Sequence, residues 1–333
     1  MESNKVVDHC TVQITQIDRK NKQYQKQKTK RVTSAKQDPK WDFPNPRKGT
    51  AFTEINFMDF KVIQDKKEIK LATYRYKPTN GQEPKALFLL FHGLNSSITH
   101  GSHIAKALAD SGFCVVGFDH RGFGGSEGKR GFLENYEIHL QDCRAFINKI
   151  EEMYGQQIKK FIGGLSMGGM SSYNMSLELP FKFAGVVLFA PAIKPFFNGF
   201  LIKVAKFIGT ITPEWRFIKQ AGTNCHRSPE MSQFQAKDPN TYANKMCAGT
   251  VKTIYTAMES SFKTFEQYNA PFLIIQGGLD KLVDPDVGYD LIERSPSQDK
   301  THWYYEGMWH DIWHEPEIVE LIPKVIKWCE ERI

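Results

Sequence analysis

The residues whose types and spacing most directly suggest chemistry lie between Phe161 and Met170, in the stretch FIGGLSMGGM. A short apolar run is followed there by Gly164-x-Ser166-x-Gly168. A serine on a sharp turn between a strand and a helix exposes its hydroxyl, and the crowding of strand and helix requires small neighbours two residues away. The stretch therefore predicts that Ser166 is a nucleophile on such a turn. An ordinary glycine-rich turn is the alternative interpretation.

A serine hydroxyl becomes a good nucleophile only when a base takes its proton and an acid orients that base. The apolar run 271–276 leads into Asp280, the first aspartate after the predicted strand. An aspartate just past a strand end can enter a site at that end, so we predict that Asp280 is the orienting acid. Asp284 is the alternative, although its place near the next helix also suits an N-cap.

The base is expected after the last apolar run, 302–305. His310 follows this run in a loop that contains a glycine, and it is the predicted base. His314 is its rival four residues later. We assign His314 instead to the start of the last helix or to a pocket wall.

Negative charge that develops on an acyl oxygen must be bound by backbone N–H groups. Leu94, which ends the segment FHGL, and Met167, which follows the nucleophile, are the predicted donors. His92 is expected to hold this loop rather than to act as a base. The glycines at 122–125 lack the Lys-Ser/Thr pair of a phosphate-binding loop and predict a tight turn.

Apolar runs alternate with amphipathic stretches along most of the chain. This pattern predicts an α/β fold with a largely parallel sheet and helices on both faces. Besides the run that leads to Ser166, buried strands are predicted at 86–91, 113–119, 184–190, 271–276 and 302–305. Helices are predicted at 102–111, 135–154, 316–332 and from Ser166 to Pro180. The segments 55–63 and 69–76 are predicted to form a β-hairpin.

A block with helical periodicity interrupts the alternation of strands and helices, and its first half is rich in Phe, Leu, Ile and Val. An insertion at this point would lie over the carboxyl ends of the strands, where sites form in such sheets. We therefore predict a helical cap at 195–266 on a core formed by 51–194 and 267–333. The apolar cap is also a candidate for peripheral contact with a membrane surface.

The net charge of +7 resides in the first 50 residues, which hold 12 Lys and Arg against 5 Asp and Glu. Residues 1–50 are therefore predicted to be a basic, extended arm, with the sheet beginning only near Ile55. One hypothesis docks the arm on an acidic protein surface or a multi-protein assembly; the alternative is a disordered, solvated tail. The docking residues would be Lys26, Lys28, Lys30 and Arg31, with Trp41 and Phe43 as apolar anchors.

The remaining composition argues against several classes of protein. Residues 51–333 have no net charge, which argues against nucleic-acid binding. The chain has no run of about twenty apolar residues and its start lacks the apolar segment of a secretory signal. The six cysteines do not show metal-ligand spacing. We expect a cytoplasmic protein, free or attached to a larger assembly or membrane surface, with neither a metal nor a cofactor.

Five segments of the chain together resemble the monoglyceride lipase branch of the α/β-hydrolases, which is grouped with serine aminopeptidase-like hydrolases. The segments are FHGL (91–94), DHRGFGGSEGKRG (119–131), GLSMGG (164–169), QGGLDKLVDP (276–285) and YEGMWH (305–310). The resemblance spans residues 86–330. It implies an α/β-hydrolase fold, a mobile apolar cap over an acyl pocket, and hydrolysis of carboxylic esters without a cofactor.

The predicted function is accordingly that of a serine ester hydrolase that forms an acyl-enzyme through Ser166, Asp280 and His310. Its predicted substrates are lipid acyl esters of the monoacylglycerol type. A peptidase or thioesterase with the same triad is one alternative, and a hydrolase-fold subunit docked in a larger assembly through residues 1–50 is another.

One segment departs from the pattern of this family. The family commonly continues its His-Gly motif with Gly-Glu-His and a later Arg, which help to hold the glycerol head group. Asn95-Ser96-Ser97 and His100 occupy these places here. We therefore expect weak discrimination between monoacylglycerols and simple esters, unless residues such as His100 or His314 rebuild the head-group site.

Overall fold

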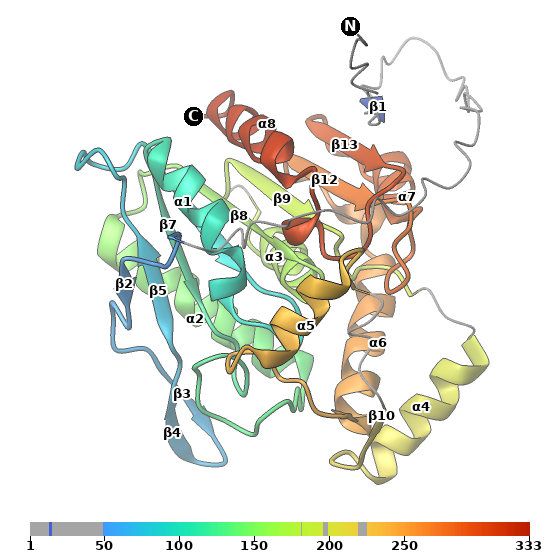
Figure 1. The fold of residues 1–333 in the computed structure, drawn as a ribbon. Coiled ribbons are helices and arrows are strands. Elements are labelled where there is room, and N and C mark those ends of the chain that lie inside the picture. The colour runs from blue at the N-terminus through green and yellow to red at the C-terminus, as the bar shows by residue number, and fades with distance from the viewer. Residues whose placement is uncertain (1–12, 15–48, 181, 196–198, 219–224) are drawn as a thin grey trace, which may run out of the picture.

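The computed structural model describes residues 13–14, 49–180, 182–195, 199–218 and 225–333. Its centre is a sheet with the strand order β1-β13-β12-β9-β8-β6-β7-β5-β2 (Figure 1). The strands are β1 (Gln13–Ile14), β2 (Glu54–Ile55), β5 (Thr73–Tyr76), β6 (Ala86–Phe91), β7 (Phe113–Phe118), β8 (Lys160–Leu165), β9 (Gly185–Phe189), β12 (Phe272–Gly277) and β13 (Lys300–Tyr305). Within this order, each strand from β13 to β7 pairs in parallel with the next strand. The predicted, largely parallel sheet is confirmed.

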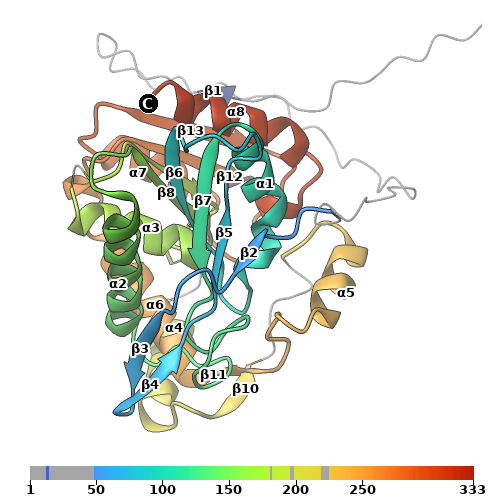
Figure 2. The same cartoon turned by 90° about the vertical axis from the view of Figure 1, so that its left-hand side faces the viewer.

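Helices cover both faces of this sheet. Figure 2 shows α1 (Ser102–Asp110) and α8 (Ile318–Glu330) on one face, and α2 (Tyr136–Tyr154), α3 (Met167–Glu178) and α7 (Val287–Arg294) on the other. The start of α2 is fixed by Asn135, whose side chain accepts a hydrogen bond from the Glu137 N–H at 2.7 Å. The predicted helices at 102–111, 135–154 and 316–332 are thereby confirmed.

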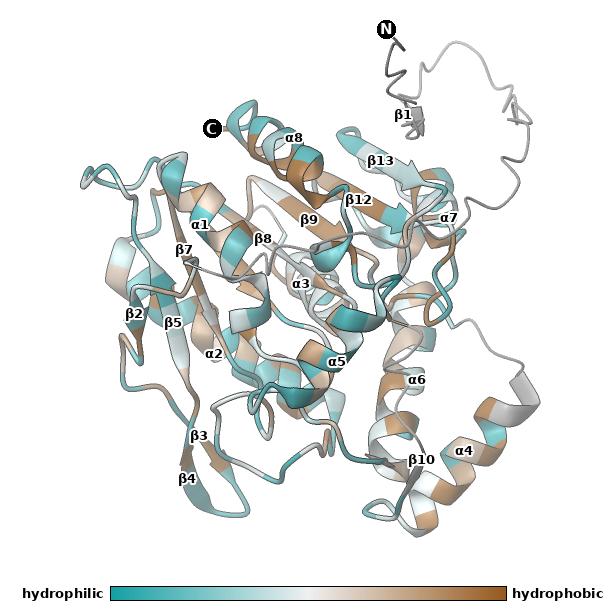
Figure 3. Ribbon diagram, in the orientation of Figure 1, coloured by the Kyte–Doolittle hydropathy of each residue, from teal (hydrophilic) through white to brown (hydrophobic). Residues whose placement is uncertain are grey.

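The central strands are buried on both faces, as their continuous apolar runs predict. Every residue of β6, β7, β9 and β12 is buried, and Figure 3 shows β9 and β12 as largely hydrophobic arrows between helices. Complete burial of one such side chain stabilises the fold by roughly 1.5–3 kcal/mol. The sheet is therefore a rigid support for the loops that leave the carboxyl ends of its strands.

The predicted hairpin exists, but it is shorter than predicted. It consists of β3 (Lys61–Gln64) and β4 (Lys67–Lys70), and it is separate from the main sheet. The segment 73–76 instead forms β5, which pairs antiparallel with β7 in the main sheet. Because Thr73, Tyr74 and Tyr76 are buried in β5, the large sheet offers this segment more apolar burial than a two-stranded hairpin could.

The expectation that the sheet begins only near Ile55 is wrong. Gln13 and Ile14 form β1, which lies opposite Tyr304 and Trp303 of β13 and adds an antiparallel edge strand. An unpaired edge strand exposes a row of backbone N–H and C=O groups, which readily pair with another strand. The basic and aromatic arm residues named above, at 26–31, 41 and 43, lie outside the described residues.

The region between β9 and β12 interrupts the alternation of strands and helices. It contains α4 (Gly199–Ile211), β10 (Arg216–Ile218), α5 (Pro229–Lys237), β11 (Met246–Cys247), α6 (Ala248–Phe262) and the 3-10 helix η3 (Phe265–Gln267). The helices α4 and α6 approach closely at Gly209, where any Cβ would collide with the carbonyl oxygen of Ala248. Among the described residues, no helix combines the length and the apolar character that crossing a membrane requires.

Candidate active site

Ser166 occupies the turn between β8 and α3, as the Gly-x-Ser-x-Gly spacing predicts. Its backbone angles are φ 56° and ψ −114°, in a region that residues other than glycine rarely adopt. A Cβ on Gly164 or Gly168 would collide with the backbone carbonyl of Phe91 on the neighbouring strand. The two glycines are therefore required by close packing of β6, β8 and α3. This packing holds the strained serine in place at the end of β8.

Asp280 and His310 meet at the carboxyl ends of β12 and β13. The Nδ1 atom of His310 donates a hydrogen bond to Oδ2 of Asp280 at 2.8 Å. The other carboxylate oxygen, Oδ1, accepts hydrogen bonds from the N–H groups of Leu282 at 2.8 Å and Val283 at 3.0 Å. Gln276 donates a further hydrogen bond to Oδ2 at 3.1 Å. The carboxylate is therefore oriented from several sides, and it fixes the proton of His310 on Nδ1.

The electrostatic surroundings of His310 favour its protonated form. Burial opposes the charged imidazolium, but the carboxylates of Asp280 and Asp311 outweigh this effect and raise the pKa of His310 above its ordinary value. The neutral form, which can accept a proton at Nε2, therefore requires a higher pH than for a free histidine. A base with a raised pKa also becomes a better proton acceptor once it is neutral.

Asp284, the alternative acid, makes different contacts. Its carboxylate forms an ion pair with Nζ of Lys194 at 2.6 Å, and Lys194 also contacts Asp290 at 2.6 Å. The Asp284 side chain accepts a hydrogen bond from the Asp286 N–H at 2.9 Å as well. The contact with the histidine is thus made by Asp280, whereas Asp284 joins Lys194 to the start of α7.

The two predicted oxyanion donors lie next to Ser166, Leu94 on the loop after β6 and Met167 at the start of α3. Met167 is the first residue of α3, and the N–H groups of a first helical turn have no partner within the helix. Leu94 follows Gly93, whose ideal Cβ position is 3.5 Å from Cβ of Ser166 and 3.4 Å from the Leu165 carbonyl. The loop after β6 therefore packs directly against the nucleophile turn, as an oxyanion-binding loop must.

His92 holds this loop through backbone contacts. Its Nε2 accepts the N–H of His120 at 2.9 Å, so that its proton lies on Nδ1 and is donated to the carbonyl of Gly93 at 2.7 Å. Nε2 of His120 donates in return to the carbonyl of His92 at 3.0 Å. Burial lowers the pKa of His92 to about 3. A neutral imidazole with both nitrogens in use is structural, in agreement with the sequence-based interpretation.

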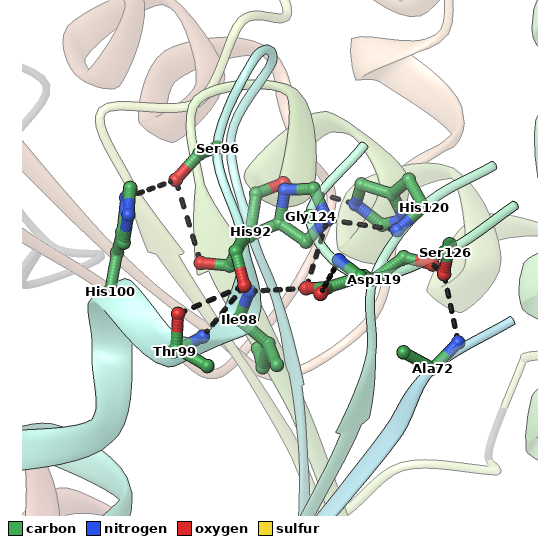
Figure 4. Close-up of polar contacts among 12 residues, drawn as sticks. Ala72, His92, Ser96, Ile98, Thr99, His100, Asp119, His120, Gly124 and Ser126 are labelled. Atoms are coloured by element: carbon green, nitrogen blue, oxygen red, sulfur yellow. Dashed lines mark hydrogen bonds and ion pairs between the residues drawn. The ribbon is translucent and has the colours of Figure 1, made fainter. Parts of the chain in front are cut away.

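Asp119 organises the segment 119–131, a role that the sequence analysis missed. Its buried carboxylate accepts hydrogen bonds from the N–H groups of Ile98 and Gly125, both at 2.7 Å, and from the hydroxyl of Tyr74 at 2.8 Å. Figure 4 shows it between the loop after β6 and the glycine-rich turn. The turn predicted from the glycines is confirmed. An aspartate just past a buried strand, three residues before a glycine-rich turn, was the available signal.

A second group of polar residues lies beside His310, and the sequence analysis considered only His314 among them. Asp311 and His314 follow the catalytic candidate, and His226 and Gln235 reach them from the region between β9 and β12. His314 was considered as a rival base and assigned instead to the start of the last helix or to a pocket wall. In the structure its Nδ1 lies 3.0 Å from the Asp311 carboxylate.

The fold and the strained serine turn define an α/β-hydrolase. Residues 82–317 match the family described as serine aminopeptidase, S33. Rat monoglyceride lipase is 29% identical over 269 residues, which cover 78% of this chain and 86% of the relative. A monoacylglycerol lipase of Mycolicibacterium smegmatis is 26% identical over 258 residues, which cover 75% and 90% of the two chains.

Solved structures agree with this comparison. The monoacylglycerol lipase of Paleococcus ferrophilus superposes with a TM-score of 0.69 at 26% identity, covering 79% of this chain and 99% of its own. A soluble variant of the monoglyceride lipase from Saccharomyces cerevisiae superposes with a TM-score of 0.72, covering 82% and 94% of the chains; at 20% identity it shows the fold alone. The chain belongs to the S33 serine aminopeptidase family and is a hydrolase of the lipase and esterase type.

Proposed function

We propose that this protein hydrolyses lipid acyl esters of the monoacylglycerol type through Ser166, His310 and Asp280. The observation that carries the proposal is the hydrogen bond of 2.8 Å between His310 and Asp280, at the sheet edge where Ser166 occupies a strained turn. Ser166 supplies the nucleophile, His310 the base and Asp280 the orienting acid. The N–H groups of Leu94 and Met167 bind the oxyanion.

The reaction proceeds in two balanced halves. Oγ of Ser166 attacks the ester carbonyl while its proton moves to Nε2 of His310, and the alcohol leaves with that proton as the acyl-enzyme forms. Water then attacks the acyl-enzyme, gives a proton to His310, and releases the fatty acid as the proton returns to Ser166. In both halves the Asp280 carboxylate stabilises the imidazolium that forms.

The substrate class is supported by the relatives and by the apolar character of residues 195–266. Several relatives are named monoglyceride or monoacylglycerol lipases. The helix α4 exposes apolar side chains at its surface, among them Phe207 at 66% and Ile211 at 62% exposure, and Figure 3 shows brown segments along it. We propose that residues 195–266 are a cap and that α4 contacts membrane lipid.

Two further parts of the proposal concern the place of action. The described cysteines are free thiols, which supports a cytoplasmic location, since disulfides are rare there. The basic charge of residues 1–50 supports docking on an acidic protein surface or assembly. Neither the location nor the docking of residues 1–50 changes the proposed reaction.

Covalent labelling tests the proposed nucleophile. A fluorophosphonate probe should label the wild-type protein. The rate of fatty-acid release from a monoacylglycerol should be proportional to the fraction of protein that the probe can label. Ser166→Ala should abolish labelling and lower turnover by many powers of ten, because only the oxyanion site remains. Ser172→Ala, in the same helix, is the matched control and should keep both. Undiminished labelling of Ser166→Ala would contradict the assignment.

A further inference from the structure

A compact group of buried nitrogen and oxygen atoms lies next to the proposed triad but takes no part in its reaction. Nδ1 of His314 is 3.0 Å from Oδ2 of Asp311, and Nδ1 of His226 is 3.3 Å from the same oxygen. His226, Asp311 and His314 each offer one possible ligand atom such that the three atoms lie within 4.8 Å of one another, and the three residues are buried. The amide nitrogen of Gln235 lies 3.0 Å from Oδ2 of Asp311 and 3.5 Å from Nδ1 of His314.

Hydrogen bonding within the described residues does not satisfy this group. Nδ1 of His226, Oδ1 of Asp311 and Nε2 of His314 are buried without a hydrogen-bond partner. Nδ1 of His226 is close to Asp311, yet the contact does not meet the geometry of a hydrogen bond. A buried polar atom without a partner costs about 1–3 kcal/mol. Of the three, Nδ1 of His226 faces Oδ2 of Asp311 at 3.3 Å, so an ion bound between these two side chains would give it a partner.

The distances fit a tetrahedral metal ion. Bonds of about 2.0–2.1 Å to a zinc ion put neighbouring ligand atoms about 3.3 Å apart. The separation of 3.3 Å between Nδ1 of His226 and Oδ2 of Asp311 has this value, and the hydrogen bond of 3.0 Å between Nδ1 of His314 and the same oxygen would lengthen slightly when the ion replaces the proton. Two imidazoles with one carboxylate are also a donor set that zinc prefers, whereas calcium and magnesium prefer oxygen alone.

We propose that His226, Asp311 and His314 bind a divalent transition-metal ion of the zinc type. The ligand atoms are Nδ1 of His226, Oδ2 of Asp311 and Nδ1 of His314. Gln235 supplies the fourth ligand through its amide oxygen, which a rotation of the amide exchanges with the nitrogen. The Nδ1 proton of His314 must leave on binding. This site departs from the sequence-based expectation of a protein without a metal.

The ion would be structural, because its ligands join two separate parts of the chain. His226 and Gln235 belong to the region between β9 and β12, whereas Asp311 and His314 belong to the loop that carries His310. The backbone already joins these parts, since the Asp311 N–H donates to the carbonyl of Cys225 at 2.9 Å. A bound ion would therefore clamp the proposed cap onto the loop of the proposed base.

Another group, His120, His139 and Cys143, also places three ligand atoms within 4.8 Å. Its contacts are different. Nε2 of His139 forms a hydrogen bond of 2.7 Å with the hydroxyl of Ser171, and Nε2 of His120 is used by the His92 carbonyl. Nε2 of His139 also contacts Sγ of Cys143 at 3.6 Å, and within the described part of the chain Nδ1 of His120 is the only nitrogen of these two rings that is buried without a partner. We therefore do not assign a metal to this group.

Cobalt titration of the full-length, metal-stripped protein tests the site, because cobalt replaces zinc and reports its own coordination. We expect saturable binding of about one cobalt ion per chain with the intense visible absorption of tetrahedral geometry, and displacement by zinc. His226→Ala and His314→Ala should weaken binding about 100-fold or more. His302→Ala, which removes a buried imidazole from β13, should leave it unchanged.

Thermal unfolding supplies an independent readout. Zinc should raise the melting temperature of the wild type and of His302→Ala but not of the two ligand variants. If an alanine variant does not fold, Asp311→Asn serves as the ligand variant in its place, because it keeps the shape of the side chain. Absence of saturable binding by the wild type at millimolar cobalt would overturn the proposal. Undiminished binding by both ligand variants, or a thiolate-to-cobalt absorption band that is lost in Cys143→Ala, would overturn it too.

Discussion

His310 and Asp280 are joined by a hydrogen bond of 2.8 Å although 30 residues separate them along the chain. The strands β12 and β13 are parallel neighbours, so the loops that follow them leave the sheet at the same edge. Asp280 is held in turn by the backbone N–H groups of Leu282 and Val283. The imidazole is therefore oriented by two loops that the parallel pair β12 and β13 brings together.

This relationship predicts different effects for the two neighbouring aspartates. Asp280→Asn should lower turnover about 10⁴-fold, because the amide favours the wrong tautomer of His310. Asp284→Asn should cost far less, since the carboxylate of Asp284 contacts Lys194. Steady-state hydrolysis by the two purified variants measures the ranking. A greater loss in Asp284→Asn would move the orienting acid to that position.

The pH dependence of activity should report the raised pKa of His310. The base must be neutral, so kcat/KM should rise with pH through the pKa of His310 and level off above it. Because the carboxylates of Asp280 and Asp311 outweigh burial and raise this pKa above 6.5 in the metal-free protein, the acid limb of that form should lie above pH 6.5. Asp280→Asn removes the negative charge beside His310 and should lower the pKa of His310. The acid limb of the residual activity of this variant should therefore lie at lower pH than that of the wild type. An acid limb well below pH 6.5 in the wild type would contradict the electrostatic argument.

The substituted head-group segment predicts broad substrate choice. Ser96 hydrogen-bonds with Nδ1 of His100 at 2.7 Å, and Nε2 of His100 lies 3.3 Å from Asp238. These groups contact one another in the segment where the family resemblance implies a head-group site. We therefore expect less than about 100-fold discrimination between a monoacylglycerol and the methyl ester of the same acid.

The measurement is kcat/KM for both esters. A greater preference for the monoacylglycerol would show that another arrangement rebuilds the head-group site. If His100→Ala then removed the preference while the methyl ester was still hydrolysed, the rebuilt site would include His100.

The exposed face of α4 predicts binding to neutral lipid vesicles. Phe207→Ser and Ile211→Ser should each weaken binding about tenfold, because partial insertion of one such side chain contributes on the order of 1.4 kcal/mol. Ile63 on the β3–β4 hairpin is 61% exposed, close to the 62% of Ile211, so Ile63→Ser is a matched control. Equal losses for all three variants in a vesicle sedimentation assay would rule out a specific role for α4.

The basic arm predicts salt-sensitive docking. Replacement of Lys26, Lys28, Lys30 and Arg31 by Glu should release the protein from its native assembly at low salt and leave esterase activity intact, because exposed charge pairs are screened by salt. The control replaces Lys61, Lys66, Lys67 and Lys70, four exposed lysines of the β3–β4 hairpin. If the arm variant co-sediments with the assembly as the wild type does, the arm is not the tether.

The sequence by itself determined the parts of this protein that depend on neighbouring residues. The serine turn was predictable because a nucleophile crowded by a strand and a helix requires small residues two positions before and after it. Gly164 and Gly168 meet this requirement within a stretch of five residues. The buried strands were predictable because continuous apolar runs between turns have few other stable arrangements. Ser166, Asp280 and His310 were predictable because each of them follows the end of one of these strands.

Only the tertiary structure decided relationships between distant segments. It placed Asp280 rather than Asp284 on His310, and it paired Gln13 and Ile14 with β13, although a two-residue strand has almost no pattern of its own. It also brought His226 to Asp311, 85 positions away in the printed chain. Such contacts depend on which strands are neighbours and on how an inserted region folds back over them. No local pattern of residue types carries that information.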